Sequence, residues 1–255
     1  MPLVKLLVNY FEDKNTFKPS SEYFEDKIDS SFKKGFITSD TNQISLIYKL
    51  KNPDILSIIC HGNKSNISML APLYEIYDEL GISYLAFDYP GYGKSTGKPC
   101  EKSMYASLDA VVDFAIKKLG FDFNKIMLHG ISLGGAVAIE GLRKYKVMAG
   151  VVDCTFTNNI DVAKIIYPKI PVYKLLKPKF NSIEKIKSIN QEMLFYHSEL
   201  DNVIPVDLGK KLFEAKQGNK EFFILKNANH RDYLVTNKGE YFGKFKEFLE
   251  KVFYK

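Results

Sequence analysis

Hydrophobic residues in the middle of the chain gather into short continuous runs. Such runs, unlike strictly alternating ones, are typical of strands that are covered on both faces of a sheet. Between the runs, hydrophobic residues recur three or four positions apart, which is the spacing of one face of an α-helix. The continuous runs predict strands at 55–60, 83–87, 125–128, 148–153, 193–197 and 221–225. The helical spacing predicts helices at 67–80, 103–119, 136–145, 206–216 and 239–253.

This alternation predicts an α/β domain in which a mostly parallel central sheet has helices on both faces. A strand that begins at Gly35 and its partner at 44–50 are expected to add an antiparallel pair before the alternation starts. Right-handed crossovers place the carboxyl ends of the parallel strands at one edge of the sheet, where ligands bind. The whole chain, residues 1–255, is long enough for one such domain with a sizeable core.

Residues 155–190 interrupt the alternation between two predicted strands. The segment contains prolines, several lysines and apolar residues that need a partner surface. A structureless loop of this length is uncommon in a compact domain and is often a lid. We therefore expect a small helical cap over the ligand-binding edge. The alternative is a surface excursion that packs only on itself.

Ser132 stands between the strand at 125–128 and the helix at 136–145, within the sequence Gly130-x-Ser132-x-Gly134. This is the nucleophile-elbow pattern, in which a serine occupies a tight strand-to-helix turn and glycines avoid collisions between neighbouring side chains. A serine at the start of a helix also lies where the helix dipole favours negative charge. The pattern indicates a nucleophile, and a glycine-rich structural turn is the alternative.

A serine hydroxyl needs a base that takes its proton and a carboxylate that orients the base. In a fold with this elbow, the three residues follow the chain order serine, acid, histidine. His230, in a polar loop after the last predicted strand, fits this order, whereas His197 ends a buried strand. His61 and His129 precede Ser132 beside glycines and are expected to shape turns.

The best-placed acid is Asp201, in the loop after the strand at 193–197. Glu199 in the same loop and Asp153 at the end of the preceding strand are alternatives. Each of the three acids could instead cap a helix or pair with a lysine. Asp232 is too close to His230 in the sequence to orient it and is expected to cap local backbone amides.

The tetrahedral intermediate of acyl transfer also needs hydrogen-bond donors for its oxyanion. The backbone N–H of Leu133, directly after the nucleophile, is one expected donor. The second is expected from the backbone N–H of Asn63, because Gly62 lets this loop approach a substrate. Asn63 could instead be only a turn residue.

Composition and charge narrow the function classes. The net charge of +6 comes mostly from lysines spread along the chain, which indicates a solvated surface and no nucleic-acid site. This charge leaves peripheral contact with an anionic membrane open. Cys60, Cys100 and Cys154 are too widely spaced for a zinc site or a disulfide framework, which favours a cytoplasmic location. The start at 2–8 is apolar only briefly and lacks the features of a signal peptide.

The glycine-rich segment at 88–97 resembles parts of two nucleotide-binding motifs. A P-loop needs a glycine where Asp88 stands, and a dinucleotide fingerprint needs one where Thr96 stands. We therefore interpret this segment as a structural loop beside the nucleophile strand. Because no cluster of histidine, aspartate and cysteine has metal-ligand spacing either, we expect no cofactor and no metal.

Together these motifs resemble the α/β-hydrolase superfamily over roughly residues 35–255. The His61-Gly62-Asn63 string and the segment 88–97 are more narrowly similar to the Bem46-like group, which includes the ABHD17-type protein depalmitoylases. The resemblance implies an α/β-hydrolase fold and an enzyme without a cofactor. It implies the following roles: Ser132 as nucleophile, Asp201 as acid, His230 as base, and the amides of Asn63 and Leu133 as oxyanion donors.

We therefore predict a serine hydrolase that cleaves small-molecule carboxylic esters or thioesters through an acyl-enzyme. One alternative is an aminopeptidase-like serine peptidase. Recognition of a free amine needs acidic side chains, and the predicted cap contains only Asp161 and Glu184. The other alternative is a non-catalytic binding protein with a hydrolase fold, against which the intact catalytic positions argue. The sequence leaves the oligomeric state open.

Overall fold

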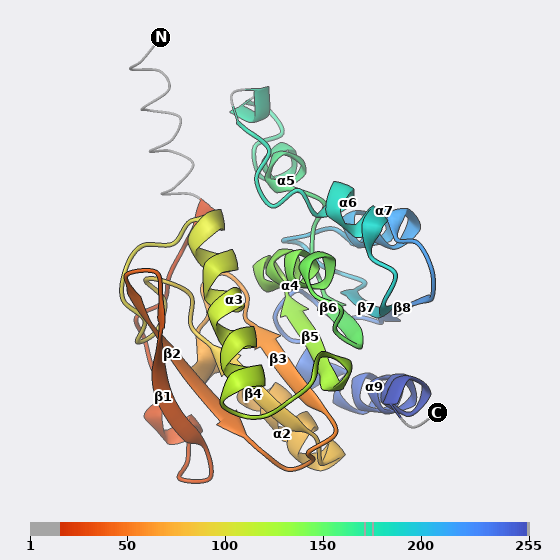
Figure 1. The fold of residues 1–255 in the computed structure, drawn as a ribbon. Helices are drawn as coiled ribbons and strands as arrows, with labels where there is room; N and C mark the ends of the chain where they lie inside the picture. Colours follow the sequence, from red (N-terminus) through yellow and green to blue (C-terminus); the bar gives the residue numbers. More distant parts are fainter. Residues whose placement is uncertain (1–15, 171, 175, 254–255) are drawn as a thin grey trace.

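The computed structural model describes residues 16–170, 172–174 and 176–253, and the structural statements below refer to these residues. The apolar start at 2–8, which we interpreted above, lies outside them. One eight-stranded sheet runs through the molecule, and helices cover both of its faces (Figure 1). The α/β class with a mostly parallel sheet, predicted from the sequence, is confirmed.

The strands stand in the spatial order β1-β2-β4-β3-β5-β6-β7-β8. β2 pairs antiparallel with β1 and β4, and the other neighbours pair in parallel. β3, β4 and β6 are buried along their whole length, as their continuous apolar runs predict. The strands are β1 (Lys33–Ser39), β2 (Asn42–Lys49), β3 (Leu56–Cys60), β4 (Ser83–Phe87), β5 (Ile126–Ile131), β6 (Ala149–Asp153), β7 (Glu192–Ser198) and β8 (Lys220–Leu225).

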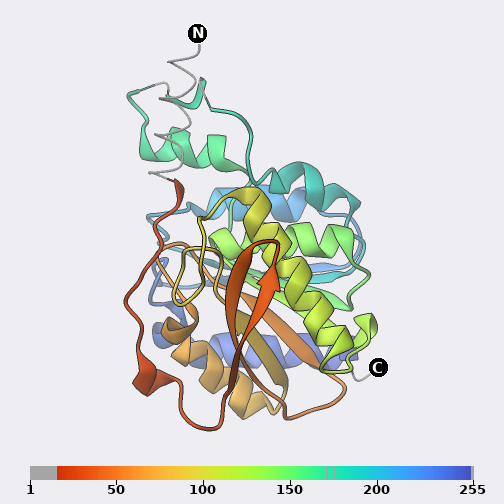
Figure 2. The same cartoon turned by 60° about the vertical axis from the view of Figure 1, so that its left-hand side comes forward.

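Two layers of helices enclose the sheet (Figure 2). One layer contains α3 (Glu101–Lys117), α4 (Leu133–Lys144), α6 (Ser182–Lys185) and α7 (Val206–Ala215). The other layer contains α2 (Ala71–Leu80), α8 (Tyr233–Thr236) and α9 (Lys238–Phe253). Each layer packs on its own buried hydrophobic cluster. Single-turn 3₁₀ helices are η1 (Glu25–Lys27), η2 (Ile67–Met69), η3 (Phe123–Lys125), η4 (Val172–Lys174) and η5 (Ile186–Ser188).

The helix expected at 67–80 is divided into η2 and α2. Proline lacks a backbone N–H and fits the first turn of a helix, so Pro72 favours a new start at Ala71. α2 ends where the glycine signal predicts, because Gly81 adopts a left-handed conformation with a φ of 68°.

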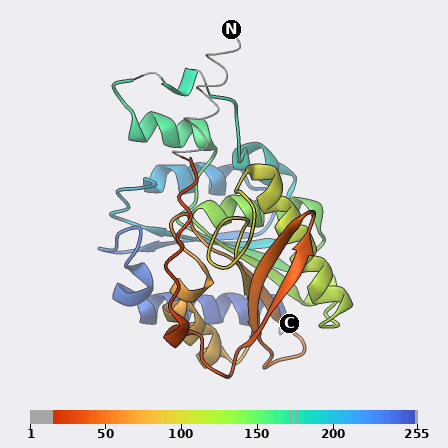
Figure 3. The ribbon, with the colours of Figure 1, turned by 90° about the vertical axis from the view of Figure 1, so that its left-hand side faces the viewer.

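The segment at 155–190 forms two different structures. α5 (Asn159–Ile166) and η4 project beyond the edge of the sheet at which the parallel strands end (Figures 1 and 3). By contrast, α6 and η5 pack against α4 and α7 in the helix layer. The part that extends over this edge is therefore shorter than the whole 155–190 segment. Within the described ranges, each helix is too short or too polar to cross a bilayer.

The segment 88–97 lies along β2, whereas we expected it beside the nucleophile strand. Asp88 donates its N–H to the Ser45 carbonyl at 2.9 Å, and Thr96 donates its N–H to the Gln43 carbonyl at 2.9 Å. In the sheet, β3 separates β4 from β5, so this loop is displaced from the nucleophile strand. Its structural character is as predicted, because the Asp88 carboxylate accepts the N–H of Ile67 at 2.9 Å.

Candidate active site

Ser132 forms the whole turn between β5 and α4. Its φ of 53° and ψ of −113° are costly for a residue with a side chain. Two hydrogen bonds stabilise this conformation: the Ser132 N–H donates to the Asp153 carbonyl at 2.8 Å, and the Thr155 hydroxyl donates to the Ser132 carbonyl at 2.8 Å. The turn is tighter than the sequence predicted, because His129 and Gly130 still pair with both neighbouring strands.

The glycines of the elbow permit close contacts between backbones. A β-carbon on Gly130 would lie 2.3 Å from the carbonyl oxygen of Gly134. One on Gly134 would lie 1.9 Å from the carbonyl oxygen of Cys60. One on Gly135 would lie 2.4 Å from the Thr155 hydroxyl oxygen. The start of α4 therefore lies directly against the end of β3 and the loop that follows it.

Three side chains that are far apart in the sequence form one chain of hydrogen bonds. His230 Nε2 lies 3.0 Å from Ser132 Oγ, and His230 Nδ1 lies 2.7 Å from Asp201 Oδ2. The carboxylate accepts the hydrogen on Nδ1, which leaves Nε2 as the acceptor for the serine hydroxyl. The three residues follow β5, β7 and β8, so the parallel topology brings them to one edge of the sheet.

Asp201 is fixed on both of its carboxylate oxygens. Oδ1 accepts the backbone N–H groups of Val203 at 2.9 Å and Ile204 at 2.7 Å, and Oδ2 accepts the His230 hydrogen bond. Burial disfavours the charged form, but the hydrogen bonds from His230 and the two amides outweigh it and hold the pKa of Asp201 below its usual value. The carboxylate is therefore ionised when it faces the imidazole.

The two alternative acids have other partners. The Glu199 carboxylate contacts Lys226 Nζ at 2.9 Å and accepts the N–H of Asn227 at 3.1 Å. Asp153 Oδ2 accepts the hydroxyls of Tyr233 and Tyr241, each at 2.9 Å. The geometry thus selects Asp201 among the three acids that the sequence left open.

His197 lies behind Asp201. Its Nε2 is 2.8 Å from the Ile204 carbonyl oxygen, so this nitrogen carries a hydrogen, and it is 3.5 Å from Asp201 Oδ2. Burial lowers the pKa of His197. Cys154, His197 and Asp201 present atoms within 4.8 Å of one another. In this arrangement His197 Nε2 carries a hydrogen, and the Asp201 oxygens already accept three hydrogen bonds. His197 therefore lies against the Asp201 carboxylate.

The two remaining histidines differ from each other. His61 Nδ1 contacts the Gly62 carbonyl at 2.8 Å, in agreement with a role in shaping a turn. His129, for which we expected the same role, instead lies within β5 in a buried polar cluster. Its Nδ1 is 2.8 Å from the Tyr77 hydroxyl, and its Nε2 is 3.2 Å from Asp153 Oδ2. We predicted a turn because a glycine follows His129. Gly130 instead lets the start of α4 pack closely against β5.

A mostly apolar cavity of about 180 Å³ opens beside Ser132. Leu133 and Asn63, the two expected oxyanion donors, both line it, and Leu133 is the first residue of α4. The apolar side chains around it come from the cap, the turn after β6 and the Asp201 loop. They are Phe156, Val162, Ala163, Ile166, Leu176, Phe180, Val203 and Ile204.

The N-terminal segment also forms part of this cavity, although its sequence carries no pattern that predicts this. Thr16 lines it, and the Thr16 carbonyl accepts a hydrogen bond from Asn63 Nδ2 at 2.7 Å. Asn63 Oδ1 accepts the N–H of Lys18 at 2.8 Å and the hydroxyl of Tyr92 at 2.7 Å. The Asn63 side chain therefore holds its own loop against two distant segments. No periodicity in residues 1–30 signalled this contact.

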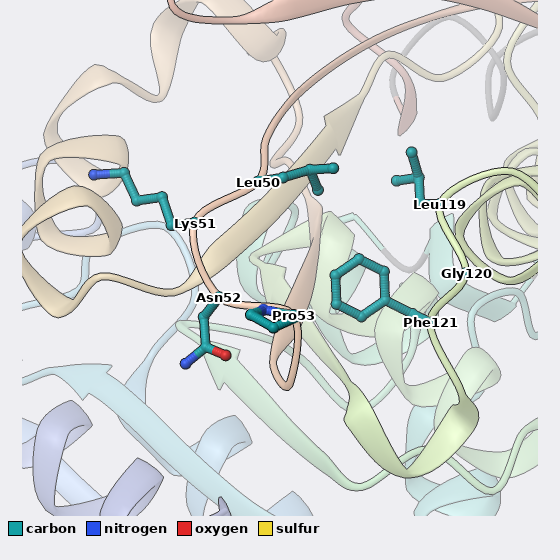
Figure 4. A pocket seen from close by; sticks show the side chains of 7 residues that line it. All are labelled: Leu50, Lys51, Asn52, Pro53, Leu119, Gly120 and Phe121. Atoms are coloured by element: carbon teal, nitrogen blue, oxygen red, sulfur yellow. The ribbon is translucent and has the colours of Figure 1, made fainter.

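A second cavity, of about 260 Å³, lies at the opposite edge of the sheet, where β3 and β5 begin. Figure 4 shows that Leu50, Pro53, Leu119 and Phe121 surround it, whereas the Lys51 side chain points away from them. Lys51 Nζ lies 3.0 Å from a carboxylate oxygen of Asp78. Because this cavity lies at the opposite edge of the sheet and is lined by other residues, it is separate from the cavity beside Ser132.

Known proteins resemble this chain in sequence and in fold. A family model described as serine aminopeptidase, S33, matches residues 51–156, which include Asn63 and Ser132 but end before Asp201. An uncharacterized protein of Mycobacterium tuberculosis is 31% identical over 175 residues, and the match spans 69% of this chain and 62% of that protein. Alpha/beta hydrolase domain-containing protein 17B of Xenopus tropicalis is 27% identical over 215 residues, with 83% and 73% covered.

Solved structures share the whole architecture. The esterase Pf2001 of Pyrococcus furiosus superposes with a TM-score of 0.77 at 23% identity and covers 92% of this chain and 99% of its own. An α/β hydrolase from Vibrio vulnificus gives a TM-score of 0.77 at 17% identity, with 97% and 94% covered. The chain has the α/β-hydrolase fold. Its sequence is similar to the ABHD17-type α/β hydrolases, as its motifs indicated.

Proposed function

We propose that this α/β hydrolase cleaves carboxylic esters or thioesters through an acyl-enzyme. The observation that carries the proposal is the hydrogen-bonded chain Ser132–His230–Asp201 at the mouth of an apolar cavity. A serine hydroxyl within 3.0 Å of an imidazole that is itself oriented by a carboxylate is the arrangement that activates serine for acyl transfer.

In the first half-reaction, Ser132 Oγ attacks the carbonyl carbon of the substrate. His230 Nε2 takes the hydroxyl proton, and the negative charge moves to the carbonyl oxygen. Asp201 remains ionised and stabilises the imidazolium. When the tetrahedral intermediate collapses, the bond to the alcohol or thiol breaks and the leaving group takes the proton from His230. The acyl group is then an ester of Ser132.

In the second half-reaction, a water molecule replaces the leaving group. His230 takes one proton from the water as its oxygen attacks the acyl carbon. Collapse of the second intermediate releases the carboxylic acid and returns the proton to Ser132 Oγ. In both intermediates the backbone N–H groups of Leu133 and Asn63 are the proposed donors to the oxyanion.

The cavity lining supports an acyl group as the part of the substrate that is bound. Side chains such as Phe156, Ala163 and Ile204 offer a surface for a hydrocarbon chain. The esterase Pf2001, whose fold this chain shares, is consistent with this chemistry. We therefore assign the acyl side of a small ester or thioester to this cavity.

The test compares hydrolysis of p-nitrophenyl acetate and butyrate by the wild type, Ser132→Ala and Ser188→Ala. Ser188 is an exposed serine whose hydroxyl donates to the Lys185 carbonyl at 2.9 Å, so it provides a matched control. We expect Ser132→Ala to lose activity by several orders of magnitude and Ser188→Ala to retain it. Equal turnover by wild type and Ser132→Ala would reject the proposal.

A serine aminopeptidase is the second candidate, because the matching family model carries that description. Recognition of a free amino group needs an available carboxylate. Asp161, the acid of α5, accepts hydrogen bonds from Thr157 at 2.7 Å and from Lys164 at 3.0 Å. Aminoacyl-coumarin substrates would decide between the two activities. A non-catalytic binding protein would instead fail to react with a fluorophosphonate probe at Ser132.

A further inference from the structure

Asp153 contacts both the nucleophile segment and the histidine segment. Its carbonyl accepts the Ser132 N–H at 2.8 Å. Its carboxylate Oδ2 accepts the hydroxyl of Tyr233 at 2.9 Å. Tyr233 is the first residue of α8 and follows His230 by three positions. One residue at the end of β6 therefore links the turn that holds the nucleophile to the segment that holds the base.

This link is buried. The exposed fraction is 0% for Asp153 and 3% for Tyr233. Away from water, a hydrogen bond to a carboxylate is strong and its geometry is narrowly defined, because no solvent replaces it when the groups separate. His129 Nε2 lies 3.2 Å from the same carboxylate oxygen, so the acceptor is fixed from the β5 side as well.

The loop that carries His230 has a second contact on its other side. The Asp232 carboxylate accepts the N–H of Asn229 at 2.7 Å, which closes a short turn around the histidine. This contact fixes the shape of the loop but connects it to no other part of the site. The Leu200 N–H donates to the Ala228 carbonyl at 2.9 Å and joins the loop to the Asp201 loop. The Tyr233 hydroxyl joins it to the central sheet, to which Asp153 belongs.

We infer that Tyr233 is a positioning residue, which places His230 at hydrogen-bonding distance from Ser132 by fixing the start of α8 to Asp153. The inference rests on the proposed hydrolase function. Without this hydroxyl, α8 loses its hydrogen bond to Asp153, and a shift of this short helix moves His230 with it. A displacement of about 1 Å at a reacting group costs on the order of 100-fold in rate.

The structure offers a matched control in Tyr241. Its hydroxyl also donates to Asp153 Oδ2 at 2.9 Å, and the side chain is equally buried. Tyr241 belongs to the long helix α9, and its ring stacks on Tyr196 with centroids 4.0 Å apart. Loss of its hydroxyl removes the same type of hydrogen bond without releasing the histidine segment.

The experiment measures the rate constant of fluorophosphonate labelling at Ser132, with the folded fraction of each variant determined by circular dichroism. We expect Tyr233→Phe to lower this rate constant and kcat about 10- to 100-fold with little change in KM, and Tyr241→Phe to stay within about twofold. Both variants are expected to lower Tm, so stability alone does not separate them. The labelling rate does.

Equal labelling rates for the two phenylalanine variants would overturn the inference while leaving the proposed function intact. Failure of the wild type to label would instead reject the function. A second pair keeps the inference testable if Tyr233→Phe does not fold. Asp153→Asn retains an oxygen that accepts the tyrosine hydroxyl, so it should label faster than Asp153→Ala; equal rates in this pair would contradict the inference.

Discussion

Gly134→Ala tests whether the contact between α4 and β3 maintains the active site. The new methyl group would lie 1.9 Å from the Cys60 carbonyl oxygen and 2.6 Å from the His61 carbonyl oxygen. Both are backbone atoms, so no side-chain rotation relieves the clash. Because β-carbons essentially never approach other heavy atoms within 3.0 Å, the helix and the strand must separate by at least about 1 Å.

The magnitude follows from two opposing effects. Alanine inside a helix is intrinsically favoured over glycine by about 0.5–1 kcal/mol. Overpacking of a tight contact costs about 1–3 kcal/mol and occasionally more. We expect the clash to prevail, so that the free energy of unfolding falls by about 1–2 kcal/mol, which corresponds to a Tm decrease of several degrees in a domain of this size. The displaced loop at 61–63 carries the proposed Asn63 donor, so activity should fall as well.

Urea unfolding and hydrolysis of p-nitrophenyl butyrate measure the two effects. Gly243→Ala in α9 is the matched control, because its β-carbon would meet no atom within 4 Å. This control is expected to gain about 0.5–1 kcal/mol and to keep full activity. A Gly134→Ala protein as stable and as active as the wild type would show that the close backbone contact is unimportant.

Three further predictions concern the acid Asp201, the acyl cavity, and the buried side chains of His61 and Asp88, whose Nε2 and Oδ1 atoms lie 3.7 Å apart. Asp201→Asn should remain folded by circular dichroism and lose about four orders of magnitude in kcat, because the amide does not stabilise the imidazolium; retained turnover would contradict this role. Ala163→Phe places a ring in the acyl cavity, so kcat/KM should fall about 10-fold more for p-nitrophenyl butyrate than for the acetate; a parallel loss would place the acyl group elsewhere. Burial lowers the pKa of His61 to about 4 and raises the pKa of Asp88 to about 6. As the pH falls from 6.5 towards 4, the unfolded chain binds a proton at His61 before the folded protein does, so this group lowers the free energy of unfolding. Asp88 has the opposite effect over part of this range, because the folded protein binds its proton before the unfolded chain does. Tm of Asp88→Asn should therefore fall more steeply than that of the wild type on acidification, and parallel Tm curves would refute this.

The sequence predicted most of the elements because burial on both faces leaves a local signature. β3, β4 and β6 appear as continuous apolar runs, and the helices between them have one apolar stripe each. The elbow was visible for the same reason, since both the strand before Ser132 and the helix after it are readable from their neighbours alone. The superposition on solved structures confirms the fold that these local signals indicated.

The expectations that differed depend on contacts between distant residues. His129 has a glycine beside it and looked like a turn residue, but sheet pairing keeps it inside β5. Residues 16–18 carry no pattern, yet Asn63 binds them through its side chain. The position of 88–97 along β2 was not predictable either, because the spatial order of the strands depends on contacts between distant segments and not on the residues of each strand.

The amino-acid sequence alone determined which segments are strands and helices, and the order in which serine, acid and histidine follow one another. The strands and helices depend on residues within a few positions of each other, and the order of the three residues is a property of the chain itself. The tertiary structure decided that Asp201, and neither Glu199 nor Asp153, contacts His230. That choice depends on strand order and loop conformation, which bring side chains from three separate strand ends within 3.0 Å of their partners.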